Sequence, residues 1–447
     1  MKFVRGLLLF GALAVGSPGI VTVQAQVFGW STIAGLAGTY GSADGTNDTA
    51  WFWQPVGVAV DINGNVYVGD SYNVTIRKLA RQGTNWVVTT IAGLANRGGY
   101  ADGTNSDIEF SEPNGIAMDS KGNLYVVDTG TYTIRKLTPM GTNWVSSTIA
   151  GQAGTGPGTV DGTNNASRFC SPYGVAVGSD DSVYVADSFN HTIRKLTQVG
   201  TNWVSSTIAG LGRASGFADG TNSAARFYYP YGIGADHFGN VYVADSGNNT
   251  IRKLTPVGTN WVTTTIAGLA HAAGYADGTN NAARFYNPYG VTADSAGNVY
   301  VADTRNYAIR QLTPVGTNWV TSTIGGSGTH TGGADGLGSA ARFGFPWGIA
   351  IDNQGVFCVA DTGNNNLRQG VGLPLIQGMG HTNGVITFTW GAVVGQTFQI
   401  QYATDLAQTS WTILGSPVTA TNAAVWWGDN IGGDTQRFYR IKVLLPE

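Results

Sequence analysis

The stretch of sequence that decides the fold is residues 230–268, PYGIGADHFGNVYVADSGNNTIRKLTPVGTNWVTTTIAG. It contains four short β-rich runs, separated by Asp, Asn, Gly and Pro residues that favour turns. The Pro-x-Gly triplet that opens the stretch recurs every 58 or 59 residues, at Pro55, Pro113, Pro172, Pro230, Pro288 and Pro346. Four strands in each of six periods is the pattern of propeller blades, so the sequence predicts six four-stranded sheets arranged in a ring.

The two ends of the repeat array predict how the ring closes. The sixth repeat stops near residues 367–369 and lacks the fourth strand of the other repeats. A run of the missing kind, which ends TIAG at residues 32–35, precedes the first full repeat. An N-terminal strand that completes the last blade would leave no strand edge exposed. We therefore expect an all-β fold, a six-bladed β-propeller over residues 27–370 closed by its N-terminal strand.

Two further segments lie outside the repeats. Residues 1–25 carry a basic start, a short apolar run and small residues before a cleavage position. They predict a signal peptide and a secreted protein, extracellular or periplasmic. Beyond the last repeat we expect a linker at residues 371–374, and alternating apolar runs over residues 375–447 predict a small β-sandwich.

The composition excludes several classes of protein. Lysine and glutamate, which fill the exposed faces of helices, are scarce, and charged residues make up only 11% of the chain, so a mainly helical protein is excluded. A content of 42% hydrophobic residues can bury a large core, which excludes disorder. The net charge is −3, and no run outside the predicted signal peptide approaches the length of a membrane span. We therefore expect no nucleic-acid partner and no membrane span.

The blades resemble NHL repeats. The resemblance rests on the pattern Pro-x-Gly-Val-Ala-Val-Asp…Gly-Asn-Val-Tyr-Val-Ala-Asp…Asn-x-x-Ile-Arg, which is clearest at residues 55–77, 230–252 and 288–310. The chain is similar above all to exported bacterial proteins of this type, whose blades carry an added Asp-Gly segment, here Asp219-Gly220 and its equivalents. The C-terminal residues loosely resemble fibronectin- or immunoglobulin-like modules. Such modules often serve attachment, spacing or sorting, so the resemblance leaves cell-surface attachment among the open roles.

Charged residues recur at the same places in every blade. One Asp ends the second strand and one Arg follows in the third: Asp70, Asp128, Asp187, Asp245, Asp303 and Asp361, with Arg77, Arg135, Arg194, Arg252, Arg310 and Arg368. They could surround a substrate, or they could form Asx-type turns with an arginine that binds loop carbonyls. One ligand rarely needs six identical groups, so we expect the structural arrangement.

Other polar groups point only weakly to a metal site. The Asp-Gly segments at Asp44, Asp102, Asp161, Asp219 and Asp277 offer oxygen ligands, but their spacing is not that of a calcium loop. We expect a turn and a capped helical turn there instead. His271 and His330 lie in neighbouring loops without a third ligand, and no Ser nucleophile elbow or phosphate-binding motif is present. We expect no catalytic residue, no metal and no cofactor.

The repeats differ from one another mainly in where they carry aromatic residues. The residue inside Pro-x-Gly, expected at the mouth of the channel, is Val56, Asn114, Tyr173, Tyr231, Tyr289 and Trp347 in blades one to six. Loops expected on the same face add further rings. The candidate ligand-binding residues are Tyr173, Tyr231, Tyr289, Trp347, Tyr72, Phe189, Arg305 and Tyr307. The rings could stack on a sugar or a peptide, or they could plug the channel and pack the loops, and the sequence leaves both open.

Two functions are compatible with these residues. The first is an exported binding or scaffold module whose aromatic face takes a protein or carbohydrate ligand. The second is a lyase- or lactonase-type enzyme, because the resemblance includes such propellers. Those enzymes hold metals through several histidines, or through a calcium site that includes a glutamate, and Glu109 and Glu112 are the two internal glutamates here. A tightly bound Ca²⁺ or Zn²⁺ in the channel would favour the enzyme.

The two cysteines test the number of blades. In a six-bladed ring Cys170 and Cys358 belong to blades three and six, on opposite sides of the channel. A disulfide requires Cα atoms within about 7 Å, so we expect both thiols to be free. Cys358 takes the place of a Tyr in the other blades and is expected to be a small buried apolar residue.

Overall fold

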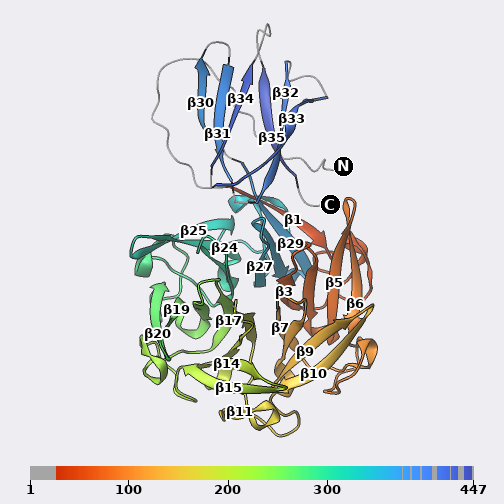
Figure 1. Ribbon diagram of the computed structural model, residues 1–447, viewed down its shortest axis with the longest axis vertical. Helices are drawn as coiled ribbons and strands as arrows, with labels where there is room; N and C mark the ends of the chain where they lie inside the picture. Colours follow the sequence, from red (N-terminus) through yellow and green to blue (C-terminus); the bar gives the residue numbers. More distant parts are fainter. Residues whose placement is uncertain are drawn as a thin grey trace. The chain divides into compact units, whose positions relative to one another are not determined.

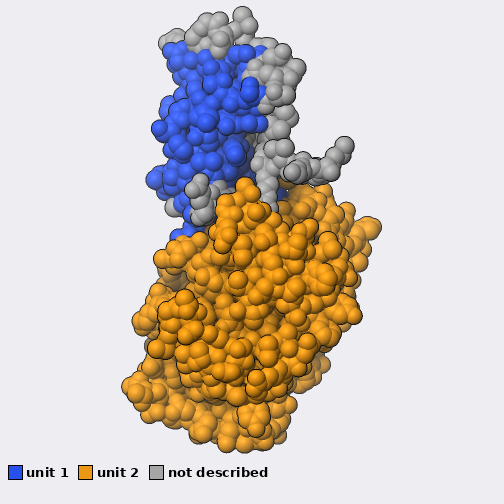
Figure 2. Space-filling view, turned by 90° about the vertical axis from the view of Figure 1, so that its right-hand side faces the viewer, with its two compact units in different colours: residues 1–29, 353–356, 370–447 blue, residues 30–352, 357–369 orange. Residues whose placement is uncertain are grey.

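The computed structural model describes residues 27–374, 376–382, 385–392, 395–404, 410–422, 424–430 and 437–444 (Figure 1). The predicted signal peptide lies outside the described residues. Those residues form β-strands and short 3-10 helical turns, with no α-helix among them. None of the helical turns in this part of the chain could cross a membrane. The chain divides into two compact units, residues 30–352 with 357–369, and residues 1–29 with 353–356 and 370–447 (Figure 2).

Six sheets repeat one antiparallel pattern, which confirms the predicted propeller. Blade one consists of β3 (Pro55–Val60), β4 (Val66–Asp70), β5 (Thr75–Gln82) and β6 (Asn85–Ala92). Blade two consists of β7 (Pro113–Met118), β8 (Leu124–Asp128), β9 (Thr133–Met140) and β10 (Asn143–Ala150). Blade three consists of β12 (Gly174–Val177), β13 (Val183–Asp187), β14 (Thr192–Val199) and β15 (Asn202–Ala209).

Blades four to six follow the same order of strands. Blade four consists of β17 (Pro230–Ala235), β18 (Val241–Asp245), β19 (Thr250–Val257) and β20 (Asn260–Ala267). Blade five consists of β22 (Pro288–Ala293), β23 (Val299–Asp303), β24 (Ala308–Val315) and β25 (Asn318–Gly326). Blade six consists of β27 (Pro346–Ile351), β28 (Val356–Asp361), β29 (Asn366–Gly372) and β1 (Phe28–Ala34). The last residues of β29 extend into the predicted linker.

Short elements join the strands at the same places in each repeat. The second and third strands are joined by η2 (Ser71–Asn73), η4 (Thr129–Thr131), η6 (Ser188–Asn190), η8 (Ser246–Asn248), η10 (Thr304–Asn306) and η12 (Thr362–Asn364). The Asp-Gly segments form β2 (Gly45–Thr46), β11 (Gly162–Thr163), β16 (Gly220–Thr221), β21 (Gly278–Thr279) and β26 (Gly336–Leu337). These five strands directly precede the helical turns η1 (Asn47–Thr49), η5 (Asn164–Ala166), η7 (Asn222–Ala224), η9 (Asn280–Ala282) and η11 (Gly338–Ala340). The corresponding turn η3 (Asn105–Asp107) has no short strand before it.

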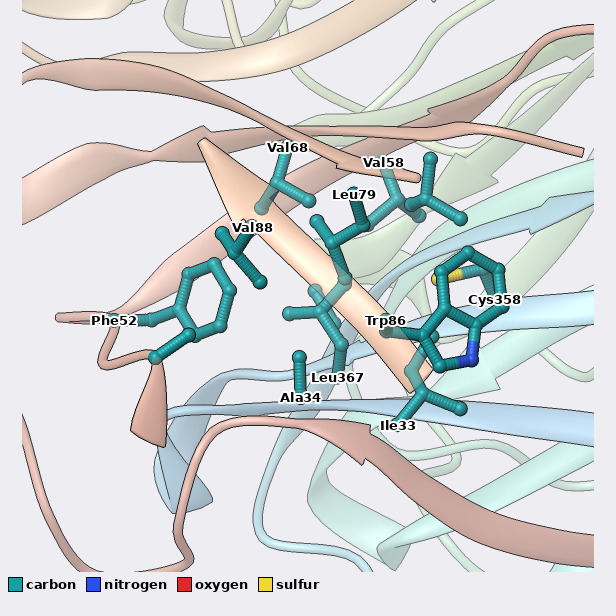
Figure 3. Close-up of a cluster of buried hydrophobic side chains, with 13 residues drawn as sticks. Ile33, Ala34, Phe52, Val58, Val68, Leu79, Trp86, Val88, Cys358 and Leu367 are labelled. Carbon is teal, nitrogen blue, oxygen red and sulfur yellow. The ribbon is translucent and has the colours of Figure 1, made fainter. Parts of the chain in front are cut away.

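The N-terminal strand closes the ring, as the sequence predicts. Strand β1 pairs with β29, so it supplies the fourth strand of blade six. Ile33 of β1 belongs to a buried cluster that joins blade six to blade one, where Cys358 lies beside Trp86 (Figure 3). Cys358 is buried as predicted, with 2% of its surface exposed. Both cysteines are free in the structure.

A ring of hydroxyl groups, which the sequence pattern did not reveal, joins every blade to the next. The first residue of each turn after the second strand donates a hydrogen bond to the carbonyl of the Pro in the following Pro-x-Gly triplet. The hydroxyl residues are Ser71, Thr129, Ser188, Ser246, Thr304 and Thr362. Thr362 donates to the carbonyl oxygen of Pro55 over 2.5 Å, so the last blade is bonded to the first.

The unit that includes residues 370–447 contains two three-stranded sheets. One has the order β30 (Ile376–Thr382), β31 (Val385–Gly391), β34 (Ala424–Asn430), and the other β33 (Thr412–Thr419), β32 (Thr397–Ala403), β35 (Phe438–Leu444). Alternate residues from both sheets, among them Phe388, Trp390, Phe398 and Ile441, share one buried core. The predicted small β-sandwich is therefore present.

Candidate functional site

The residue inside each Pro-x-Gly triplet lies at the start of an innermost strand. In blade one Pro55 pairs with Asp70, the last residue of β4, so the triplet lies at the end of the blade that also carries the turn η2. Packing against the next blade explains why the residue that follows is glycine. A Cβ atom at Gly57 would collide with the carbonyl of Asn114 on the next inner strand, and each of the other five triplet glycines meets the next blade in the same way. The inner strands therefore approach one another at backbone distance, with the variable residue at the channel mouth.

Four aromatic side chains meet at this mouth. The ring centroids of Tyr173 and Tyr231 are 4.6 Å apart, and those of Tyr231 and Tyr289 are 4.7 Å apart. Tyr289 and Trp347 are also 4.7 Å apart, and Trp347 lies 6.4 Å from Tyr173, which completes a closed circuit of contacts. All four side chains are half-buried. We call these four residues the mouth cluster; the structure brings together four of the eight candidate residues.

The remaining part of the mouth has no aromatic ring. Val56 is half-buried there, whereas Asn114 is buried and takes part in the hydroxyl ring. Its Oδ1 accepts a hydrogen bond from Ser71, and its Nδ2 donates to Thr129 Oγ1, both over 2.8 Å. Asn114 therefore serves the packing of blades one to three, and the aromatic part of the mouth is confined to blades three to six.

The channel beside these rings is narrow. Its cavity of about 100 Å³ is lined by the variable residue, the glycine and the following residue of all six triplets. Pockets that enclose a drug-sized ligand have volumes of roughly 300–1,000 Å³. The rings therefore leave little free space in the channel. A ligand of that size would have to lie on the rings rather than inside the channel.

The other four candidate residues lie in the surrounding loops. Tyr72 is exposed, and its ring lies 5.6 Å from that of Trp53. Phe189 lies 4.9 Å from Tyr229, which in turn stacks at 6.5 Å on Tyr231 of the mouth cluster. Phe189 is thus linked to the cluster through one intermediate ring.

Arg305 and Tyr307 pair with aromatic residues of an adjacent loop. The guanidinium of Arg305 lies 5.4 Å from the ring centroid of Tyr286, and the rings of Tyr307 and Phe345 are 5.0 Å apart. Tyr286 and Phe345 shortly precede Tyr289 and Trp347 in the sequence, and Arg305 lies close enough to Tyr289 to influence the pKa of its phenol.

The hydroxyl groups of the mouth cluster are held neutral. Burial, the nearby Glu112 carboxylate and the neighbouring Tyr289 raise the pKa of Tyr173 to about 12. Burial also raises the pKa of Tyr231 and of Tyr289, although Arg305 acts on Tyr289 in the opposite direction. Near neutral pH the three phenols can therefore donate as well as accept hydrogen bonds.

Glu112 is a residue of the mouth that the aromatic pattern did not indicate. The residue before Pro-x-Gly is Gln54, Glu112, Ser171, Tyr229, Asn287 or Phe345 in blades one to six, so one blade alone carries a carboxylate there. The side chain is exposed and lies close enough to Tyr173 to influence the titration of its phenol. Alignment of the six repeats could have found this exception.

The repeated Asp and Arg residues form a structural network, as expected. Arg77 donates from Nη1 to Asp70 over 2.8 Å and to the carbonyl of Trp51 over 3.0 Å. Its Nη2 binds Asp44 of the Asp-Gly segment over 2.8 Å, and the guanidinium lies 5.1 Å from the ring centroid of Phe52. An arginine lies between the two corresponding carboxylates in each of the other blades. Burial raises the pKa of the Asp70 carboxyl to about 6, while Arg77 acts to lower it.

The Asp-Gly segments have a role beyond the predicted turn. Gly45 and Thr46 pair with Val88 and Val87, so the segment forms a fifth strand on the outer strand of blade one. The same pairing occurs in blades three, four and five. Because an unpaired outer strand is an aggregation hazard, these segments cover a vulnerable edge.

Three of the histidines have different neighbours. His191 packs on Tyr229 with ring centroids 5.0 Å apart, and His271 packs on Phe217 at 5.1 Å. His330 shares a hydrogen bond of 2.7 Å with Thr329 through Nδ1. Within the described ranges, no three His, Cys, Asp or Glu side chains gather as a metal ion would need.

Comparison with known proteins identifies the repeats. The family described as NHL repeat matches residues 52–79, 110–137, 169–196, 285–312 and 343–369. Human NHL repeat-containing protein 2 is 29% identical over 303 residues, which cover 61% of this chain and 40% of the relative. The chloroplastic protein SUPPRESSOR OF QUENCHING 1 of Arabidopsis thaliana is 29% identical over 287 residues, 62% of this chain and 26% of the relative. The chain thus spans between about a quarter and two fifths of the length of these curated relatives.

A solved structure shares the fold. The crystal structure of an auxiliary nutrient binding protein from Bacteroides ovatus matches with a TM-score of 0.57 and 16% sequence identity. The match covers 78% of this chain and 77% of that one. At this level of identity the likeness concerns the fold alone.

Proposed function

The chain contains NHL repeats in a β-propeller fold, and we propose that it is an exported binding module whose mouth cluster takes a carbohydrate ligand. The observation that carries this proposal is the closed circuit of Tyr173, Tyr231, Tyr289 and Trp347. The rings pack against one another, and each remains partly exposed. Aromatic side chains that already pack against one another lose little conformational entropy when a ligand covers them.

The polar groups around the cluster suit a sugar. A pyranose presents an apolar face of C–H groups and a rim of hydroxyls, so it needs an aromatic surface with donors and acceptors beside it. The neutral phenols supply both kinds of group, and Glu112 and Arg305 supply one charge of each sign at the edge. A peptide ligand would use the same rings through its apolar side chains, and it is the competing outcome of the test below.

Two further observations support a binding role outside the cytoplasm. The first is the predicted signal peptide at residues 1–25. The second is the shared fold of proteins whose names describe auxiliary nutrient binding, from Bacteroides ovatus and Bacteroides thetaiotaomicron. In this proposal residues 27–370 bind the ligand, and the sandwich of residues 375–447 serves a separate role such as attachment to the cell surface.

A glycan array on the full mature chain tests the proposal, followed by calorimetric titration of the best soluble oligosaccharide. We expect Trp347→Ala and Tyr231→Ala each to weaken binding by about 0.5–1.5 kcal/mol without unfolding the propeller. Phe238→Ala is the matched control, because Phe238 is an exposed aromatic residue in the turn at the opposite end of its blade. Binding of peptides but of no glycan would reject the carbohydrate. Equal affinities of all three variants would reject the site.

A further inference from the structure

One aromatic side chain of the sandwich lies on its surface and not in its core. Trp426 lies on β34, at the edge of the sheet β30-β31-β34, and 64% of its surface is exposed. Its neighbours Val425 and Trp427 alternate to the inner side and join the buried core of the sandwich. An indole is rarely left so exposed, because its burial contributes more than that of almost any other side chain.

A glycine explains how the indole lies. A Cβ atom placed on Gly428 would be 3.1 Å from Cη2 and 3.6 Å from Cζ2 of Trp426. The same Cβ position is 3.7 Å from Cγ1 of Val385 on the adjacent strand. The ring therefore extends along its own strand over the space that the missing side chain leaves. Two atoms of its benzene ring lie close to Gly428, and most of the indole is open to solvent.

Hydroxyl groups lie beside the open ring. Thr389 pairs directly with Trp426 across the two strands, and Thr387 pairs with Gly428. On its other side Thr387 pairs with Gly380 of β30, so two glycines flank it in the same row. The sheet surface beside the indole therefore carries only small side chains, and it presents hydroxyl groups with no large side chain between them. The described residues that share this face on β31 and β34 are Val385, Thr387, Thr389, Gly391, Ala424, Trp426, Gly428 and Asn430, and none of them is charged.

We propose that this face of the sandwich is a second carbohydrate-binding site, for a neutral polysaccharide. A pyranose ring would stack on the exposed indole of Trp426, and its hydroxyls would exchange hydrogen bonds with Thr387 and Thr389. The absence of charged residues on the described part of this face matches an uncharged glycan better than an acidic one. Because the side chains beside the indole are small, an extended polysaccharide chain could continue across the sheet beyond the stacked sugar. This site does not depend on the mouth cluster, which belongs to the other unit.

Retention of the full mature chain on insoluble cellulose, xylan and chitin tests the proposal. We expect at least one of these neutral polysaccharides to retain the protein, and Trp426→Ala to weaken that retention roughly two- to ten-fold. Trp426→Phe should recover part of the loss, because a smaller ring still stacks. Ile413→Ala is the matched control, since Ile413 is 61% exposed on an outer strand of the opposite sheet.

A second variant keeps the indole and changes only its position. Gly428→Val places side-chain atoms where the Trp426 ring lies, so we expect a loss comparable to that of Trp426→Ala. Wild-type protein that is not retained on any of the three polysaccharides would overturn the proposal, and so would equal retention of Trp426→Ala and Ile413→Ala. Light scattering after size-exclusion chromatography tests whether a second copy of the chain, instead of a polysaccharide, covers this face. If Trp426→Ala only converts a dimer into a monomer and leaves retention unchanged, this face binds a second copy of the chain and the proposal is wrong.

Discussion

Thr32 and Asp335 are hydrogen-bonded to each other although 303 residues separate them in the sequence. The backbone N–H of Thr32 donates to Asp335 Oδ1 over 2.8 Å, and the Thr32 hydroxyl donates to the same oxygen over 3.0 Å. Asp335 directly precedes β26, which lies on one edge of β1, while β29 lies on the other edge. Arg368 of β29 binds Asp335 over 3.0 Å, so the closing strand is held from both sides. We call these contacts of Asp335 the clasp. Blade one has an equivalent contact, in which the backbone N–H of Thr90 on β6 donates to Asp44, but there β6 follows β5 directly in the sequence.

Removal of this clasp should loosen the closing strand selectively. We expect Asp335→Ala to lower the free energy of local opening of β1 by about 2 kcal/mol, because two hydrogen bonds to a carboxylate are lost. Hydrogen exchange at residues 28–34, read by mass spectrometry, measures the change. Asp44→Ala removes the equivalent carboxylate in blade one, where β6 is still attached to β5 by a hairpin. An equal increase in exchange at β6 in that control would show that the clasp has no special role in closure.

The buried thiol reports whether the N-terminal strand is in place. Cys358 lies in the cluster that β1 covers through Ile33 and Ala34, and burial raises the pKa of its thiol well above the ordinary range (Figure 3). We expect Cys358 in the intact chain to resist iodoacetamide and to become reactive when residues 28–34 are deleted. Cys170, which is half-buried near Asp187, should react in both proteins and serves as the internal control. Peptide mass spectrometry distinguishes the two sites, and an unreactive Cys358 in the shortened chain would contradict the prediction.

The two carboxylates bound by one arginine should differ in their contribution to stability. Arg252 is completely buried and binds Asp245, which is also completely buried, over 2.7 Å. It also binds Asp219, whose side chain is 48% exposed, over 2.7 Å. We expect Asp245→Ala to cost about 3–5 kcal/mol, because it leaves a buried guanidinium without its buried partner. Asp219→Ala should cost about 1 kcal/mol, since water replaces part of the lost contact. Equal shifts of the urea midpoint would refute this difference.

The buried tyrosines of the second strands should make the propeller sensitive to alkali. Tyr125, Tyr242 and Tyr300 donate hydrogen bonds to Asp119, Asp236 and Asp294, and burial, followed by the nearby carboxylate, raises the pKa of each phenol in the folded chain. In the unfolded chain these phenols have a pKa of about 10. Below pH 10 both states bind the proton and stability is unaffected, whereas above pH 10 only the unfolded state loses it, so stability falls as pH rises.

Absorbance at 295 nm and far-UV circular dichroism, followed together, measure this effect. Phenols in contact with water should titrate first, and the buried ones should titrate together with the loss of β-structure. Tyr125→Phe keeps the packing and removes the titrating group, so it should move the alkaline midpoint upward. Complete phenolate formation while the circular dichroism is still native would contradict the assignment.

The fold could be predicted from the sequence because each blade carries its own strand and turn pattern. The sixth repeat lacked one strand and the N-terminus offered it, so closure by β1 followed from the sequence alone. The contacts between blades could not be found in the same way. The hydroxyl bond from Thr362 to Pro55, and the close approach of Gly57 to Asn114, depend on how far apart the inner strands lie. That distance is a property of the closed ring.

The candidate site was predictable in part for the same reason. The identity of Tyr173, Tyr231, Tyr289 and Trp347 as mouth residues followed from their place in the repeat. Whether the rings touch one another or line an open channel depends on the diameter of the ring, which sequence does not reveal. The exposure of Trp426 was equally hidden, since a single-residue shift of register would have turned it into the core of the sandwich.

The close approach of neighbouring inner strands has a consequence for how such a protein can be altered. The glycine of each triplet is fixed by contact with the next backbone, and the carbonyl of the proline is fixed by its hydroxyl bond. Asn114 is bonded through its side chain to Ser71 and Thr129, but at the other five positions the side chain bears neither duty, and Val, Tyr and Trp all occur there. We therefore expect these five positions to be exchangeable singly, without a change in the diameter of the ring. The side chains at the mouth can therefore vary while the backbone contacts of the ring stay the same, so a single substitution can change which ligand the mouth prefers.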